Sequence, residues 1–207
     1  MLHLDKTYLY RMTHIENIPH ILENGITHSK SLNANLNFVP IGDSSLISKR
    51  SEFLLDNGRK LGEYIPFYFG VRTPMLYVVQ KGFNMVASIP PEKIIYCVSS
   101  VQKIIDLKLD FVFTDGHAVD RLSMQYAIND IQNIDTIIDK NSIVSKYWID
   151  ENDLDRKRKK EAEFLVLGDI AQSAILGYIS YNEKAKNSLI DFGIDTASVY
   201  SKSQYYF

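Results

Sequence analysis

The chain has 207 residues, of which 45% are hydrophobic and 23% charged, and its formal net charge is −2. A chain of this length and composition can bury a sizeable core, so we expect one domain, residues 1–207. The small net charge argues against a protein that coats nucleic acid by bulk electrostatics, but not against an enzyme that meets a few nucleotides in a local groove.

Two further features of the composition bear on location and chemistry. No apolar run reaches the ~20 residues that span a bilayer, and the N-terminus lacks the basic-then-apolar pattern of a signal peptide. We therefore expect a cytoplasmic protein with no membrane partner. The single cysteine, Cys97, lies in the apolar run 94–98, which predicts a buried strand residue and not a nucleophile or a thiolate metal ligand.

The first half of the chain predicts short strands and helices around one long loop. Residues 7–13 read as a strand, and apolar residues at helical spacing after it predict a helix that ends at Gly25. The elements that follow are a loop at 29–45 rich in Ser and Asn, a helical turn at 47–55, a strand at 64–69 and a strand or helix start at 75–80.

The second half predicts more strands than helices. The strands are 94–99, 111–114, 163–167, 175–180 and a closing strand at 198–206. The helices are 101–107, 123–133 and 182–192. Because neither a repeat nor a linker is visible, we expect a single mixed α+β domain.

The segment 64–76 reads Tyr-Ile-Pro-Phe-Tyr-Phe-Gly-Val-Arg-Thr-Pro-Met-Leu. An aromatic strand runs into Gly70, and an arginine and a Thr-Pro turn follow at once, which marks a sharp exit from a sheet. An ordinary core strand with its turn would explain this pattern. From the residues alone this explanation is favoured, and a turn that holds a polar group at the rim of a ligand cleft is the alternative.

One local charge run stands out, Arg156–Lys160, directly after an acidic stretch at 150–155. Such a run is usually a solvated helix face. Because it lies just upstream of Glu163, a role in holding phosphates is the alternative.

Motifs of other nucleotide and metal enzymes are missing. The histidines are scattered, without an H-x-H or H-E-x-x-H pattern or a cysteine pair, so the sequence gives no support to a metal-dependent nuclease and we expect no metal. The glycines also lack the spacing of a P-loop or a Rossmann fingerprint.

Six segments resemble, in the same order and with comparable gaps, the DarT-type DNA ADP-ribosyltransferase toxins. They are YRMTHIENIP at 10–19, ILENG at 21–25, IGD at 41–43 with Lys49 and Arg50, the segment 64–76 (similar to YVPFYFxPRSPML), FVFTDGH at 111–117 (similar to FVFTDxH), and AEFLV at 162–166. Each match is short, but together they extend over nearly the whole chain.

The resemblance implies an α+β, ADP-ribosyltransferase-like fold, with two packed, strongly bent β-sheets and helices around an NAD cleft. It implies a toxin that breaks the bond between nicotinamide and ribose and moves ADP-ribose from NAD onto a base of single-stranded DNA. The matches at 64–76 and 162–166 favour thymine over guanine as that base. A macrodomain antitoxin similar to DarG is the partner that the resemblance implies.

The same resemblance points to two catalytic residues. Glu163, the glutamate of AEFLV, matches the carboxylate that grips the ribose and stabilises the positive charge that develops on it. Arg50 matches an arginine that binds NAD and assists proton removal from the base. Glu161 competes with Glu163, because on a strand the two side chains would share a face.

Further site residues follow from the matched segments. Arg11, Met12 and Thr13 form the turn expected to meet nicotinamide, chiefly through backbone groups, and here Arg11 replaces the histidine of some members. His20 and His28 lie where the first helix and its exit face NAD in the family, although a purely structural role suits an isolated histidine better. A second departure is Gly62, where members often carry histidine.

The long segment 115–161 matches the family least, and acceptor choice belongs to it. Asp115 and His117 are expected to contact the substrate base or to brace this loop, and a hydrogen bond that simply caps the exit of the strand is an equal alternative. Tyr147 and Trp148 are candidates to stack on a base, with a place in the core as the alternative. An ADP-ribosyltransferase acting on RNA or protein, and a catalytically silent nucleic-acid-binding domain, are the alternative functions.

Overall fold

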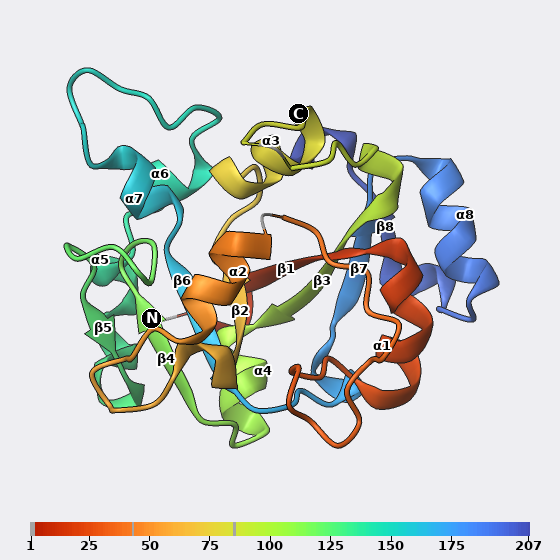
Figure 1. Cartoon of the computed structure of the whole chain (residues 1–207), viewed down its shortest axis with the longest axis horizontal. Helices are drawn as coiled ribbons and strands as arrows, with labels where there is room; N and C mark the ends of the chain where they lie inside the picture. The colour runs from red at the N-terminus through yellow and green to blue at the C-terminus, as the bar shows by residue number, and fades with distance from the viewer. Residues whose placement is uncertain (1–2, 43, 85) are drawn as a thin grey trace.

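The computed structural model describes residues 3–42, 44–84 and 86–207, and in these ranges the strands form one sheet in the order β5-β4-β6-β2-β1-β3-β7-β8 (Figure 1). The strands are β1 Tyr8–His14, β2 Tyr64–Tyr68, β3 Ile94–Ser100, β4 Phe111–Thr114, β5 Gln125–Tyr126, β6 Glu163–Leu167, β7 Gly177–Ser180 and β8 Val199–Ser201. The α-helices are α1 Ile18–Asn24, α2 Ser44–Ser51, α3 Pro74–Lys81, α4 Val101–Asp106, α5 Ile134–Ile137, α6 Lys140–Val144, α7 Arg156–Lys160 and α8 Glu183–Asp191.

The sheet has two halves that meet at one point. β1 pairs with β3 along its whole length, and β2 pairs with β6 along its whole length, but β1 and β2 share only the register pair Tyr10 and Tyr68. Two separate packed sheets were predicted; this single pair joins them into one hydrogen-bonded sheet, whose halves spread to either side of the β1–β2 junction (Figure 1).

The strand β6 lies at the centre of one half, between β2 and β4. Its residues Glu163 to Val166 are fully buried, and Phe164 packs against the rings of Phe111 and Phe69. Cys97 on β3 is buried as predicted, and burial raises the pKa of its thiol to about 12, so it stays protonated.

Local chemistry explains the elements that border the pocket. α1 ends where predicted, because Gly25 takes the left-handed φ of 76°. The ambiguous segment 75–80 is helical, since Thr73 accepts a hydrogen bond from the Leu76 amide (3.3 Å) and Pro74 opens the helix. Asp43 of the IGD segment lies outside the described residues.

Two predicted elements are wrong. The helix predicted at 123–133 begins as the short strand β5, which pairs with β4, and continues as a 3-10 helix over Ile128–Asn133. The closing strand predicted at 198–206 ends at Ser201, because the chain turns there and the Tyr206 hydroxyl binds the carbonyls of Ile94 and Ile179. In both places tertiary partners override the local pattern.

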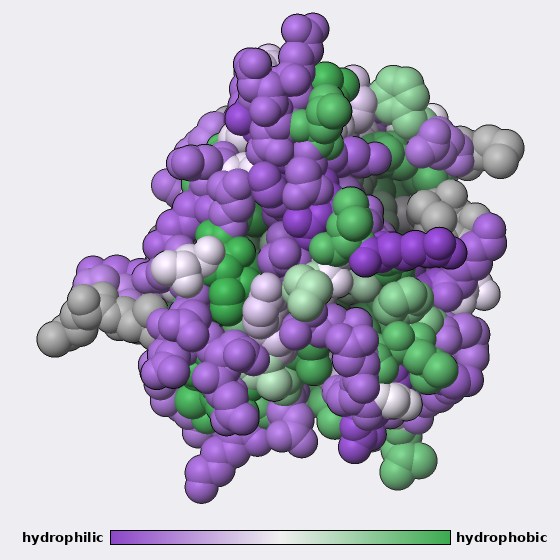
Figure 2. Space-filling model, turned by 90° about the vertical axis from the view of Figure 1, so that its left-hand side faces the viewer, coloured by the Kyte–Doolittle hydropathy of each residue, from purple (hydrophilic) through white to green (hydrophobic). Residues whose placement is uncertain are grey.

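The face at the left of Figure 1 is mainly hydrophilic, with separate apolar patches between the polar side chains (Figure 2). In the described residues no helix combines the length and the apolar character needed to cross a membrane.

Candidate active site

Glu163 and Arg50 form a two-pronged ion pair in the interior. The Arg50 Nη1 lies 3.1 Å from the Glu163 Oε1, and Nη2 lies 2.6 Å from Oε2. The Glu163 side chain is 0% exposed and that of Arg50 17%. Glu163 opens β6, in the sheet, while Arg50 comes from the last turn of α2, so the pair joins elements that are 113 residues apart.

The loop after β4 completes the surroundings of this pair. The Ala118 amide donates to the Glu163 Oε1 (2.9 Å), and the Glu163 amide donates to the Thr114 Oγ1 (3.2 Å). The His117 Nε2 lies 3.0 Å from the Arg50 Nη1. Because a guanidinium can only donate, Nε2 is the unprotonated nitrogen of a neutral imidazole.

These contacts fix the charge of each group. Burial raises the pKa of Glu163, but the charge and hydrogen bonds of Arg50 outweigh it and hold that pKa below its ordinary value. Burial likewise opposes the charge of Arg50, and the Glu163 carboxylate holds the Arg50 pKa above its ordinary range. Burial lowers the pKa of His117. The cluster at neutral pH is therefore an anion, a cation and a neutral ring.

Glu161 does not share the strand with Glu163. It is the residue after α7, with φ −94° and ψ 20°, and β6 begins two residues later, so the predicted common strand face is wrong. Burial raises the pKa of Glu161 to about 7, although the charge of Lys157 opposes this. In the part of the chain that the structure describes, the Glu161 carboxylate forms no ion pair with an arginine, whereas Glu163 is paired with Arg50.

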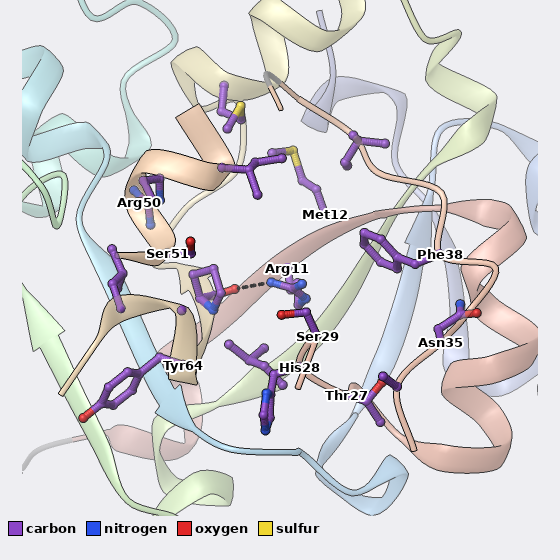
Figure 3. Close-up of a pocket in the computed structure, with 18 of the residues that line it drawn as sticks. Arg11, Met12, Thr27, His28, Ser29, Asn35, Phe38, Arg50, Ser51 and Tyr64 are labelled. Atoms are coloured by element: carbon purple, nitrogen blue, oxygen red, sulfur yellow. Dashed lines mark hydrogen bonds between the residues drawn. The ribbon is translucent and has the colours of Figure 1, made fainter. Parts of the chain in front are cut away.

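A pocket of about 580 Å³ lies beside the pair, with Arg50 in its wall. Its lining comes from β1, the segment 27–41, α2 and β2, and Figure 3 shows Arg50, Ser51 and Tyr64 on one side and Asn35 and Phe38 on the other. Most of the lining is apolar, with a few polar groups directed inward, which is the usual make-up of a small-molecule site.

Some of the residues predicted to bind NAD line this pocket, and others do not. Arg11, Met12 and His28 line it, and the Arg11 Nη1 donates to the Pro66 carbonyl (3.0 Å; Figure 3). Thr13 is buried, where its hydroxyl accepts from Asn17 (3.1 Å). His20 is not in the lining; its Nε2 contacts the Thr27 hydroxyl (3.2 Å).

Asp169, which no sequence motif includes, fixes the turn that carries His28. The Asp169 carboxylate accepts from the His28 amide (3.0 Å) and from the Ser31 hydroxyl (2.5 Å). Asp169 follows β6 after Gly168, and its partners lie about 140 residues earlier. An acidic residue just after a buried strand is the only signal that the sequence offers.

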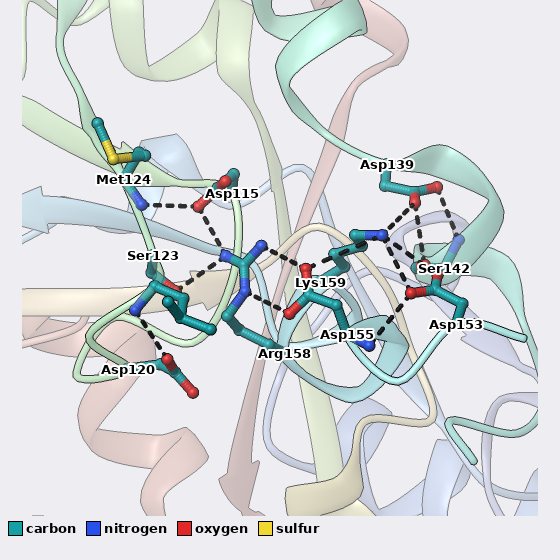
Figure 4. A network of polar contacts seen from close by, with 11 residues as sticks. Asp115, Asp120, Ser123, Met124, Asp139, Ser142, Asp153, Asp155, Arg158 and Lys159 are labelled. Carbon is teal, nitrogen blue, oxygen red and sulfur yellow. Dashed lines mark hydrogen bonds and ion pairs between the residues drawn. The ribbon is translucent and has the colours of Figure 1, made fainter. Parts of the chain in front are cut away.

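The basic run is held by the acids of its own chain. The Arg158 guanidinium binds both oxygens of Asp155 (2.7 Å each) and the Asp115 Oδ1 (2.9 Å), and the Lys159 Nζ lies 3.2 Å from Asp153 (Figure 4). These ion pairs argue against the phosphate-binding interpretation. The run is not a fully solvated helix face either, because the Arg158 side chain is only 11% exposed and Lys160 is buried. The ion pairs also place Asp115 as a brace of this loop.

The two acceptor-stacking candidates lie in different surroundings. Tyr147 is 64% exposed, and the Lys146 ammonium lies 5.3 Å from the centre of its ring. Trp148 packs edge-on against Tyr77 (5.4 Å) and Phe207 (5.8 Å), so it fits the core alternative more closely. Of the two candidates, Tyr147 has the more exposed ring.

The described residues contain no cluster of three or more His, Cys, Asp or Glu side chains that could hold a metal ion.

A sequence model of the family described as "ssDNA thymidine ADP-ribosyltransferase, DarT" matches residues 10–207. The chain belongs to the DarT family. A DNA ADP-ribosyl transferase of Escherichia coli O127:H6 is 31% identical over 98% of this chain and 94% of its own length. A DNA ADP-ribosyl transferase–DNA ADP-ribosyl glycohydrolase fusion protein of Thermosipho africanus is 34% identical over 86% of this chain and 44% of its own length.

Solved DarT structures share the fold. Thermus sp. 2.9 DarT in complex with ADP-ribosylated ssDNA has a TM-score of 0.82 and 25% identity, and the match covers 98% of this chain and 97% of that one. The same protein in complex with NAD+ has a TM-score of 0.78 and 26% identity, over 97% and 98%. The predicted α+β, ADP-ribosyltransferase-like fold and the predicted enzyme class, a DNA ADP-ribosyltransferase that uses NAD, are confirmed.

Proposed function

We propose that this chain acts as a toxin that transfers ADP-ribose from NAD to thymine in single-stranded DNA, with Glu163 and Arg50 as its catalytic residues. The observation that carries the assignment of residues is the buried Arg50–Glu163 pair at the wall of the 580 Å³ pocket. One cluster of buried hydrophobic residues includes members from Leu9 to Val199, which supports the proposal that the chain is a single domain.

Glu163 supplies a fixed negative charge. When the bond between nicotinamide and ribose breaks, positive charge develops on the ribose, and a carboxylate held in a dry site stabilises it without having to reorganise. The ion pair with Arg50 and the Ala118 amide keep this carboxylate ionised and oriented. An ionised Glu163 can afterwards accept the proton that the attacking base nitrogen loses.

Arg50 connects Glu163 with the pocket. Its guanidinium carries donors beyond those that Glu163 uses, and a planar fork of donors suits the pyrophosphate of a dinucleotide. His117, neutral and bound to Arg50 through Nε2, keeps the guanidinium in this orientation. His117 therefore acts here as a positioning residue for Arg50.

The pocket suits NAD in chemistry and in size, because ligand pockets of about 300–1,000 Å³ enclose molecules of this class. Met12 and the neighbouring apolar lining offer a surface for the flat nicotinamide ring, while Arg11 and His28 offer polar contacts. Thr13 and His20 support the wall from behind through Asn17 and Thr27. NAD bound in the Thermus DarT structure supports this placement.

The acceptor strand would meet the exposed Tyr147, whose ring can stack on a base, while Lys146 beside it offers a charge to the phosphates. Asp115 holds the loop and does not touch the base in this proposal. The partner is an antitoxin that removes ADP-ribose; the transferase–glycohydrolase fusion of Thermosipho supports such a pairing.

The test is incubation with labelled NAD and mixed-sequence single-stranded DNA, with wild type, Glu163→Ala and the surface control Glu183→Ala. We expect label on DNA with wild type and the control only, and digestion to nucleosides should place it on thymidine. Label found on RNA or protein instead would show that the acceptor is not DNA. A wild type that binds NAD and DNA without transferring label would favour the silent binding domain.

A further inference from the structure

Lys160 is a buried lysine that the proposed reaction does not use. It is the last residue of α7, its residue exposure is 1%, and its Nζ donates to the carbonyl of Ile143 (3.0 Å) and to that of Ser145. Burial, and then the charge of Arg72, lower the pKa of Lys160 to about 8. Burying a charged group costs free energy unless hydrogen bonds compensate it, so the Lys160 ammonium needs these two carbonyls and keeps them in place.

Those two carbonyls lie where α6 ends and a long loop begins. α6 covers Lys140–Val144, and α7 lies beside it, while the loop that joins the two helices projects from the molecule (Figure 1). The Ser145 hydroxyl donates in turn to the Tyr147 carbonyl (2.5 Å). Lys160 therefore fixes the backbone that leads directly to Tyr147.

The same segment also contacts the exit of β2. A Cβ added to Gly70 would lie 2.7 Å from Ile143 Cγ2 and 3.0 Å from the Ile143 carbonyl oxygen, so Gly70 and Ile143 are in close contact. Ile143 thus contacts both the Gly70 turn and the Lys160 ammonium, which also binds the Ser145 carbonyl. On the catalytic side, Lys160 is separated from Glu163 by only two residues.

We propose that Lys160 is a positioning residue that holds the segment 143–147 in register with the catalytic strand β6, and so sets the affinity for the nucleic-acid acceptor. This inference builds on the proposed function. NAD binds in a pocket whose lining includes none of the residues 143–160, so Lys160 should affect the acceptor and not NAD.

The experiment compares wild type with Lys160→Met, which keeps the length of the side chain and removes its donors. The control is Ser99→Ala, because Ser99 is also buried and also donates to a main-chain carbonyl (Ala174, 2.7 Å), on the distant strand β3. For Lys160→Met we expect KM for single-stranded DNA to rise about tenfold, the effect of losing charged hydrogen bonds, with KM for NAD within about twofold.

Two measurements distinguish a positioning role of Lys160 from a general loss of protein stability. Hydrogen exchange of the amides of 143–148 should accelerate in Lys160→Met and not in Ser99→Ala, and Lys160→Arg should restore most of the DNA affinity. Equal changes in both KM values, or unchanged exchange at 143–148, would overturn the proposal. A wild type without transfer to DNA would instead contradict the proposed function, and the exchange experiment would still test the contact.

Discussion

Glu163 keeps its charge although none of its side chain reaches solvent. The free energy that burial costs a carboxylate is offset by two hydrogen bonds from Arg50 and one from the Ala118 amide. Its lowered pKa means that Glu163 stabilises the fold above its ordinary titration range and loses this contribution only in acid, below pH 4.5. Between pH 5 and 8 its charge is constant.

Glu163→Gln should remove the negative charge while keeping the shape of the side chain. We expect transfer of ADP-ribose to fall by about 10²–10³-fold, the size of one preorganised electrostatic contact, while NAD still binds. Steady-state transfer together with calorimetry of NAD binding would check this. Activity within about threefold of wild type would rule out Glu163 as the stabilising charge.

Glu161 is expected to make stability depend on pH in the opposite direction. Its folded pKa of about 7 lies above the ordinary 4.5, so the folded state binds the proton more tightly, and stability falls as pH rises from 4.5 to 7. Glu161→Gln removes this loss. The melting temperature of the variant should equal that of wild type at pH 4.5 and exceed it by a few degrees at pH 8; a constant difference at both pH values would contradict the account.

At the scale of elements, the pocket wall depends on the contact between the end of α1 and the turn after β6. Gly25 has a left-handed φ, and its neighbour Ile26 pairs with Ile170. Asp169, one residue before Ile170, binds the turn at 28–31, which begins two residues after Ile26. The strand that begins with Glu163 and the loop that lines the pocket are therefore joined at a second point.

Gly25→Ala should destabilise the protein by about 3 kcal/mol, since a left-handed φ is strained for alanine and its Cβ would meet a backbone oxygen. That Cβ would lie 2.2 Å from the Ile170 oxygen. Gly58→Ala is the matched control, because Gly58 has a similar φ of 79° with no heavy atom within 4 Å. It should cost about 1 kcal/mol in urea denaturation. Equal losses for both variants would show that the close contact contributes nothing.

Asp169→Asn should loosen the turn at 28–31 without touching the Arg50–Glu163 pair. We expect KM for NAD to rise about threefold to tenfold, as for the loss of a charged hydrogen bond, with kcat nearly unchanged. Asp191→Asn, the same change on the exposed end of α8, serves as the control. A fall in kcat at constant KM would show that Asp169 acts on the reaction and not on the NAD side of the pocket.

Across the whole chain, the sequence predicted correctly those strands and helices that a local pattern of residues determines. The strand at 163–167 and the end of α1 at Gly25 were predicted correctly because an apolar run and a glycine cap are local signals. The segment 123–133 was assigned to a helix because its pairing with β4 is not local.

The same limit applies to the site. Glu163, Arg50 and His117 were found through their motifs, and the structure brings all three together. Asp169 was missed, because its partners lie about 140 residues away and it belongs to no motif. Lys160 was seen only as part of the charge run, because the composition of that run does not show that the ammonium is buried on two carbonyls. The ion pairs that occupy the basic run could not be read from its composition either.

The most direct test of the central claim is mass spectrometry of two single-stranded oligonucleotides of equal length, one with a single thymine and one with none. Each is incubated with NAD and either wild type or Glu163→Gln. The account predicts the added mass of one ADP-ribose only on the thymine oligonucleotide and only with wild type. Equal modification of both oligonucleotides, or equal modification by Glu163→Gln, would contradict it.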